Sequence, residues 1–114
     1  MRELRIGKQS VRVRATALAL LFYKQEFKAD LIGDLTKMKD VADDPSKLDS
    51  IQILQMVWAM AKADAFGKPF LSFVEWVATI EDFDLADSAF IAGALEEAAD
   101  GFFRSGIKGA PIQK

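Results

Sequence analysis

The chain has 114 residues and a mass of 12.6 kDa; 51% of its residues are hydrophobic and 28% are charged. This balance argues against a disordered chain, and the length suits one domain with a sizeable core. The chain contains neither Cys nor His, which excludes disulfides and removes the commonest general base and transition-metal ligand. A net charge of −2 and a pI of about 5.1 disfavour a general nucleic-acid binder.

The most apolar stretch, residues 15–23 (ATALALLFY), follows a basic segment, as the core of a secretory signal would. It is followed by Lys24, Gln25 and Glu26 without a small-residue cleavage site, so we reject a signal peptide. No apolar run approaches the roughly 18 residues that a membrane-spanning helix needs. We therefore expect a cytoplasmic protein with no membrane contact.

Residues 1–15 alternate between apolar and charged or polar side chains. This period of two predicts a β-hairpin with one apolar face. The residues expected to point inward are Leu4, Ile6, Val11, Val13 and Ala15.

Two registers of this hairpin are open. A two-residue loop at Gly7 and Lys8 would set Glu3 opposite Arg12, whereas a four-residue loop would set Glu3 opposite Arg14. Both registers keep the same residues on the inward face.

From Thr16 the apolar period becomes helical, and Thr16 is the expected N-cap, its hydroxyl accepting from a first-turn amide. The first helix should present a wide apolar face of Leu18, Leu20, Leu21, Phe22, Tyr23 and Phe27. A second, shorter helix is expected over residues 30–38, with its apolar stripe formed by Leu31, Ile32, Leu35 and Met38.

Asp44 and Pro45 predict the start of a long helix, with Asp as the N-cap and Pro at the first helical position. The helix should run to about Phe66, where Gly67 can end it. Apolar residues occupy one stripe and also its neighbouring positions, which predicts the central helix of the core. The stripe is Ile51, Leu54, Trp58, Ala61 and Ala65.

Ser72 and Glu75 fit a capping box at the start of a short helix ending near Ile80 or Glu81. Residues 84–87 (DLAD) are expected to open a last helix that runs to Phe102. The predicted fold is α+β and mostly α. A single domain spans residues 1–104, with the hairpin in 1–15 and about five helices of a compact bundle in 16–104. Residues 105–114 are expected to form a flexible tail.

No arrangement of residues supports catalysis or a cofactor. The acidic residues in the range 81–87 lack the spacing of an EF-hand, and the dipole of a helix N-terminus favours acidic residues in any case. Glu96 and Glu97 are adjacent and point in different directions around a helix. No glycine pattern fits a P-loop or a dinucleotide fingerprint. We expect a protein that is not an enzyme and holds no metal or cofactor.

Charge is unevenly distributed along the chain. Residues 1–24 hold six Lys or Arg and one Glu, whereas residues 69–103 hold eight Asp or Glu and no Lys or Arg. If these regions lie on different sides of the fold, they predict head-to-tail self-association between unlike charges. The alternative is that the two regions neutralise each other within one chain.

Two sets of residues are candidate partner contacts. The hairpin cations Arg5, Arg12 and Arg14 form the first set, although a solvated outer face without a partner is the alternative. Phe102 and Phe103 form the second set, because adjacent helix residues cannot share one narrow face and an exposed aromatic side chain marks a partner site. Burial of both rings in the bundle is the alternative for this pair.

A basic hairpin is followed by residues 16–27 (TALALLFYKQEF), 30–35 (DLIGDL), 57–62 (VWAMAK) and 73–76 (FVEW). In this order and spacing, the chain resembles the tail assembly chaperone family of long-tailed phages and prophages of Gram-positive bacteria. The resemblance extends over about residues 1–105.

The resemblance implies a non-catalytic morphogenesis factor that acts in the cytoplasm of the bacterial host and is absent from the mature virion. Such proteins bind the tape measure protein, keep it soluble and help recruit tail-tube subunits. The resemblance also implies a longer, frameshifted product, of which this chain would be the short form. The alternatives are a structural virion component, such as a tail-tube or head–tail joining protein, and a small DNA-binding regulator, whose recognition helix should be basic.

Overall fold

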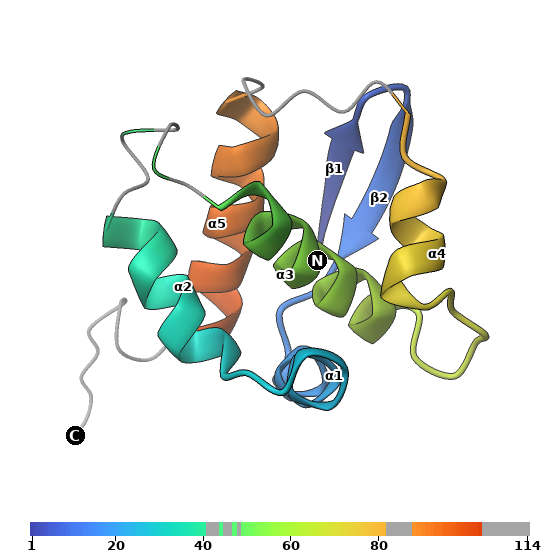
Figure 1. Ribbon diagram of the computed structural model, residues 1–114, viewed down its shortest axis with the longest axis horizontal. Coiled ribbons are helices and arrows are strands. Elements are labelled where there is room, and N and C mark those ends of the chain that lie inside the picture. Colours follow the sequence, from blue (N-terminus) through green and yellow to red (C-terminus); the bar gives the residue numbers. More distant parts are fainter. Residues whose placement is uncertain (41–43, 45–46, 48, 82–87, 104–114) are drawn as a thin grey trace.

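The computed structural model describes residues 1–40, 44, 47, 49–81 and 88–103 of the chain (Figure 1). An antiparallel hairpin of β1 (Arg2–Ile6) and β2 (Gln9–Val13) precedes the helices. The helices in this part of the chain are α1 (Ala17–Phe27), α2 (Leu31–Asp40), α3 (Ser50–Asp64), α4 (Phe73–Ala78) and α5 (Ser88–Phe102). The predicted α+β, mostly α fold is confirmed. The expected helix start at 84–87 and the expected tail at 105–114 lie outside the described residues.

The hairpin adopts the shorter of the two predicted loops. Glu3 lies opposite Arg12, and Ile6 lies opposite Gln9 on either side of the two-residue turn. Gly7 has a φ of 59°, a left-handed conformation that glycine adopts without steric cost. The inward face follows the predicted alternation, with its buried residues being Leu4, Ile6, Val13 and Ala15.

Helix α3 forms the centre of the core, as predicted. Trp58 is 1% exposed, and its indole Nε1–H donates a hydrogen bond to the carbonyl oxygen of Leu71 at 3.0 Å. In Figure 1, α3 runs through the middle of the molecule, with the hairpin behind it, α1 below and α4 at its far end. Buried side chains occupy almost every turn of the helix: Ile53, Leu54, Met56, Val57, Trp58, Ala59, Met60, Ala61 and Ala63.

The predicted start of this helix at Asp44 and Pro45 is wrong. The helix begins at Ser50, and Asp49 is the N-cap, with its carboxylate accepting from the backbone amides of Ile51 and Gln52. The amide of Lys47 donates to the carbonyl oxygen of Asp44 at 2.9 Å, so Asp44 belongs to a separate turn. The helix ends at Asp64, two residues before the predicted end.

The predicted inward face of α1 is only partly correct. Leu21 is 49% exposed, whereas Ala19 and Tyr23 are fully buried. Leu21 lies two residues from both Ala19 and Tyr23, about 200° around the helix, so burial of those two residues turns Leu21 outward. Ile51 is likewise 50% exposed despite its place in the predicted stripe of α3, because it lies in the first turn at the end of the helix. In α2 the predicted stripe is buried at Leu31, Leu35 and Met38.

Thr16 occupies the N-cap position of α1, but the predicted hydrogen bond from its side chain is absent. Its hydroxyl is buried and has no hydrogen-bond partner in the described part of the chain. Thr16 instead lines a polar hollow together with Arg2, Glu97 and Asp100. The entry to α1 is therefore determined by packing and by the bond from the Ala19 amide to the Thr16 carbonyl oxygen.

An aromatic cluster joins α1, α3 and α4. The Phe27 ring lies edge-on to Trp58 and to Phe73, with ring centroids 5.6 and 5.0 Å apart. Such edge-to-face pairs add about 0.5–1.5 kcal/mol each beyond burial. The predicted capping box of Ser72 and Glu75 is present at the start of α4, which ends at Ala78, slightly earlier than predicted.

Two helical glycines give opposite predictions for substitution by alanine. A Cβ on Gly101 in α5 would overlap the carbonyl oxygen and Cβ of Ala15, whereas a Cβ on Gly33 in α2 would meet only the exposed side chain of Asp30 at 3.4 Å. We expect G33A to raise the free energy of unfolding by up to about 1 kcal/mol, the usual helix preference for alanine. We expect G101A to lower it despite that preference. Urea denaturation of both variants measures the difference, and stabilisation by G101A would contradict the close packing of α5 on Ala15.

Tyr23, the only tyrosine, gives a prediction for alkaline pH. Its hydroxyl donates to the Asp34 carboxylate at 2.8 Å, and burial together with this bond raises the pKa of Tyr23 above its ordinary value of 10.0. The protonated side chain thus stabilises the fold below pH 10, and this contribution is lost as the pH rises from 10 towards the folded-state pKa. We expect tyrosinate absorbance to appear only as the chain unfolds. Tyrosinate absorbance that appears at pH 10 while the circular dichroism spectrum stays native would contradict this prediction. The variant Y23F should lose less stability than the parent chain as the pH rises above 10.

Candidate functional site

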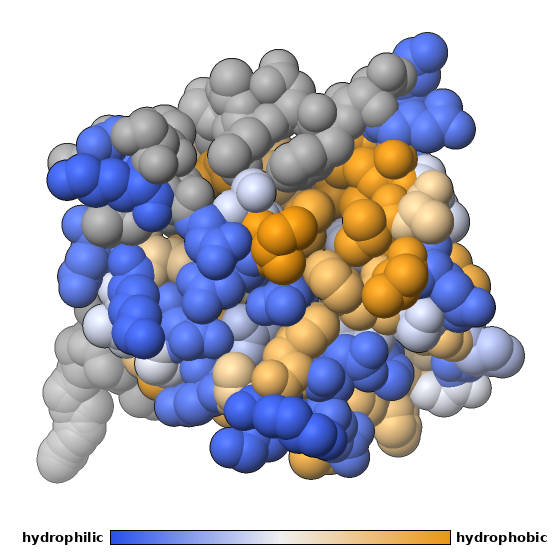
Figure 2. All heavy atoms as spheres, viewed as in Figure 1, coloured by the Kyte–Doolittle hydropathy of each residue, from blue (hydrophilic) through white to orange (hydrophobic). Residues whose placement is uncertain are grey.

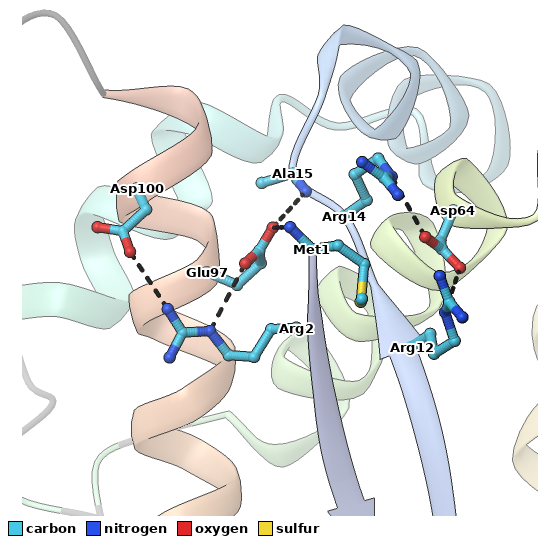
Figure 3. A network of polar contacts seen from close by, with 8 residues as sticks. All are labelled: Met1, Arg2, Arg12, Arg14, Ala15, Asp64, Glu97 and Asp100. Atoms are coloured by element: carbon cyan, nitrogen blue, oxygen red, sulfur yellow. Dashed lines mark hydrogen bonds and ion pairs between the residues drawn. The ribbon is translucent and has the colours of Figure 1, made fainter.

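The predicted contact residues Arg12 and Arg14 bind a carboxylate of the same chain (Figure 3). Both guanidinium Nε atoms lie 3.2 Å from Asp64, one on each oxygen. The Asp64 side chain is 12% exposed, so the two ion pairs lie at the edge of the core. The amide of Arg14 also donates to the carbonyl oxygen of Met60 at 3.0 Å. These contacts fasten β2 to the last turn of α3.

Arg2 fastens the other strand to α5. Its guanidinium lies 2.9 Å from Glu96, 3.2 Å from Asp100 and 3.5 Å from Glu97. The basic hairpin and the acidic last helix are therefore neighbours, and the charges that pair do so within one chain. Arg12 and Arg14 pair with Asp64, which lies outside the acidic segment 69–103. Head-to-tail self-association stays a prediction. Arg5 is exposed on the outer face of the hairpin, opposite Ser10.

Glu97 is the buried charged residue at the centre of this network. It is 6% exposed, and one carboxylate oxygen accepts a hydrogen bond from the Ala15 amide at 3.1 Å. Figure 3 shows this carboxylate pointing between the ends of β1 and β2, towards Ala15, Arg2 and the Met1 amine. Glu97 thus links the last helix to both strands, which is a structural role.

The second predicted contact pair, Phe102 and Phe103, is half-buried. Both rings pack against the hydrophobic core, and the Lys39 ammonium lies 5.1 Å from the centroid of Phe103. Both rings thus contribute to the bundle and both stay partly exposed, so their role as partner contacts stays a prediction. They lie at the end of α5, next to α2, and not beside the hairpin cations.

A different set of apolar side chains is exposed, on α3, α4 and the segment that joins them. Figure 2 shows hydrophobic side chains gathered over these two helices, on the face seen in Figure 1. Val74 is 75% exposed and Phe66 is 69% exposed, more than any other large hydrophobic side chain in the described ranges. We call the four exposed residues the α3–α4 surface: Ile51, Phe66, Leu71 and Val74.

The α3–α4 surface is not predicted from the sequence, in which Ile51 belongs to the core stripe and Phe66 to the end of the same helix. A signal for it does exist in the sequence. Helix α4 has only six residues, and four of them are Phe73, Val74, Trp76 and Val77. So short a helix buries one side only, and apolar residues at adjacent positions cannot all face that side. At least one of them must be exposed, and the structure exposes Val74.

Other kinds of site find no support in the described part of the chain. It contains no group of three or more acidic, His or Cys residues arranged to hold a metal ion. None of its helices is long and apolar enough to cross a membrane.

Comparisons of the chain with family models, with curated proteins and with solved structures give no significant match.

The role of Glu97 gives a prediction for stability. E97A removes the acceptor of the buried Ala15 amide and one of the three carboxylates around Arg2, so we expect a loss of about 1–3 kcal/mol in the free energy of unfolding. E97Q keeps an acceptor and should lose less than E97A. E96Q is the matched control, because the Glu96 side chain is 63% exposed. Equal effects of E97A and E96Q in urea denaturation would contradict the buried link.

Proposed function

We propose that this protein is a non-catalytic tail assembly chaperone that binds the tape measure protein and helps recruit tail-tube subunits during phage tail morphogenesis. The observation that carries the proposal is the α3–α4 surface. A chain of this size with a well-packed core exposes several large apolar side chains on two helices and their connection. Phe66, Leu71 and Val74 lie close together along the chain, whereas Ile51 lies at the other end of α3. Exposed large apolar side chains mark a site for a protein partner.

The chemistry of the surface suits a helical partner. Its four residues offer only aliphatic and aromatic contacts, which bind the apolar face of an amphipathic helix without selecting individual polar groups. The resemblance implies that the partner is the tape measure protein, a long helical chain that needs its apolar faces covered before assembly. Aromatic side chains are enriched at protein interfaces, so Phe66 is the residue of this surface that we expect to contribute most to binding.

The distribution of charge supports a protein partner over DNA. Three of the hairpin arginines already contact carboxylates of α3 or α5, which lowers the positive potential that phosphates would need. Helix α5 is acidic and lacks the basic side chains of a recognition helix. Under this proposal the protein acts in the cytoplasm of the bacterial host and is left out of the finished virion.

The test is co-expression with the tape measure protein encoded in the same phage or prophage genome. We expect the tape measure protein to be insoluble alone and to co-purify with this chain when both are present. The double variant F66S/V74S should reduce co-purification at least tenfold while its melting temperature stays close to that of the parent chain, because both side chains are exposed.

The matched control is L21S, which removes an exposed leucine from α1, outside the α3–α4 surface. L21S should leave co-purification unchanged. A tape measure protein that is equally soluble with and without this chain would overturn the proposal. Detection of the chain in purified virions by mass spectrometry would favour the structural virion component instead.

A further inference from the structure

The outer edge of β2 carries main-chain groups that have no partner. In a hairpin with a two-residue turn, the pair next to the turn is hydrogen-bonded, and the pairs then alternate. Since Ile6 and Gln9 flank the turn, the amide and carbonyl groups of Ser10 and Arg12 point away from β1. The amide of Arg14, next in this row, follows the same rule and donates to Met60 in α3. Within the described ranges, the main-chain groups of Ser10 and Arg12 make no such bond.

A groove lies against this edge. It has a volume of about 430 Å³ and separates β2 from α4, which stands beside the strand in Figure 1. This volume lies within the range of about 300–1,000 Å³ that is usual for binding pockets. The apolar walls of the groove include Val11 of β2, Phe70 of the preceding segment and Trp76 of α4. Ser10 and Arg12 also line the groove.

A row of alternating donors and acceptors selects an extended peptide as the occupant. Ser10 and Arg12 are two residues apart, so their groups repeat at about 6.8 Å, the repeat of a β-strand. A helix satisfies its own main-chain groups and offers none to the edge. An added strand offers the same repeat and places alternate side chains on opposite faces, one face towards Val11 and Trp76 and the other towards solvent.

The charges on the outer face of the hairpin indicate which solvent-facing side chains the added strand should carry. Arg12 of β2 is 59% exposed, and its Nε contacts Asp64. Arg12 would be next to an added strand, whereas Arg5 and Glu3 lie on β1, one strand further away. An acidic, outward-facing side chain beside Arg12 on the added strand would pair with its guanidinium.

We propose that the groove between β2 and α4 binds an extended segment of a partner protein with alternating apolar and acidic residues, which adds to β2 as a third strand. This site differs in residues and in chemistry from the α3–α4 surface, and it does not depend on the partner of that surface. Loss of one kind of binding therefore leaves the other intact.

The test uses a synthetic eight-residue peptide that alternates valine and glutamate, with amide exchange of the intact chain followed by NMR. In the free protein, the amides of Ser10 and Arg12 should exchange much faster than those of the paired residues Gln9 and Val11. Saturating peptide should slow the exchange of Ser10 and Arg12 at least tenfold. Methylation of the peptide nitrogens on the side that faces β2 should abolish binding, whereas methylation on the opposite side should not.

S10P removes the outward amide without breaking a bond of the hairpin, since proline is tolerated at such an edge position. We expect S10P to weaken binding at least tenfold. E3P places the same change on the outer edge of β1 and should retain binding, and circular dichroism verifies that both variants are folded. No protection at millimolar peptide overturns the proposal, as does equal binding by S10P. Protection that grows with protein concentration in the absence of peptide also overturns it, in favour of pairing between two copies of the chain.

Discussion

Burial of α3 on nearly every side is the constraint on which the rest of the structure depends. Helices α1, α4 and α5 and strand β2 all pack against it. A two-stranded hairpin is only marginally stable alone, so the N-terminal strands gain their stability from this helix. The same requirement explains why a chain with so few elements needs an apolar composition of 51%. A helix that is apolar all round must be covered all round.

Two carboxylates position the hairpin on this core. Asp64 at the end of α3 holds both arginines of β2, and Glu97 of α5 accepts the Ala15 amide beside Arg2. The hairpin offers a narrow apolar face, and apolar contact is not directional. Charge-assisted bonds have preferred distances and angles, so they determine where each strand lies. The arginines of the basic N-terminal segment thus form ion pairs with carboxylates that are distant in the sequence.

Helix α4 separates two surfaces of different chemistry. Val74 is exposed, whereas Trp76, two positions on, is 6% exposed and lines the groove beside β2. Two residues correspond to about 200° around a helix, so the two side chains point to nearly opposite sides. One side presents apolar side chains, and the other faces free main-chain groups of a strand. The capping box of Ser72 and Glu75 holds the start of this short helix in one conformation between them.

The sequence by itself determined the features that depend on local periodicity and local hydrogen bonds. The inward face of the hairpin, the capping box of α4 and the core position of Trp58 follow from residues within a few positions of one another. The sequence also limited the hairpin to two registers, and the left-handed conformation of Gly7 accompanies the shorter loop.

Only the tertiary structure decided the features that depend on distant partners. Asp44 and Asp49 are both suitable N-cap residues, and the helix starts after Asp49. Leu21 is as apolar as its neighbours, but the side of α1 that packs into the core is the one with Ala19 and Tyr23, which leaves Leu21 outside. The two candidate binding surfaces also depend on distant partners. The short length of α4 already requires that one of its apolar residues is exposed. Which residue this is, and whether the edge at Ser10 and Arg12 stays open, depends on the distant segments that cover α4 and β2.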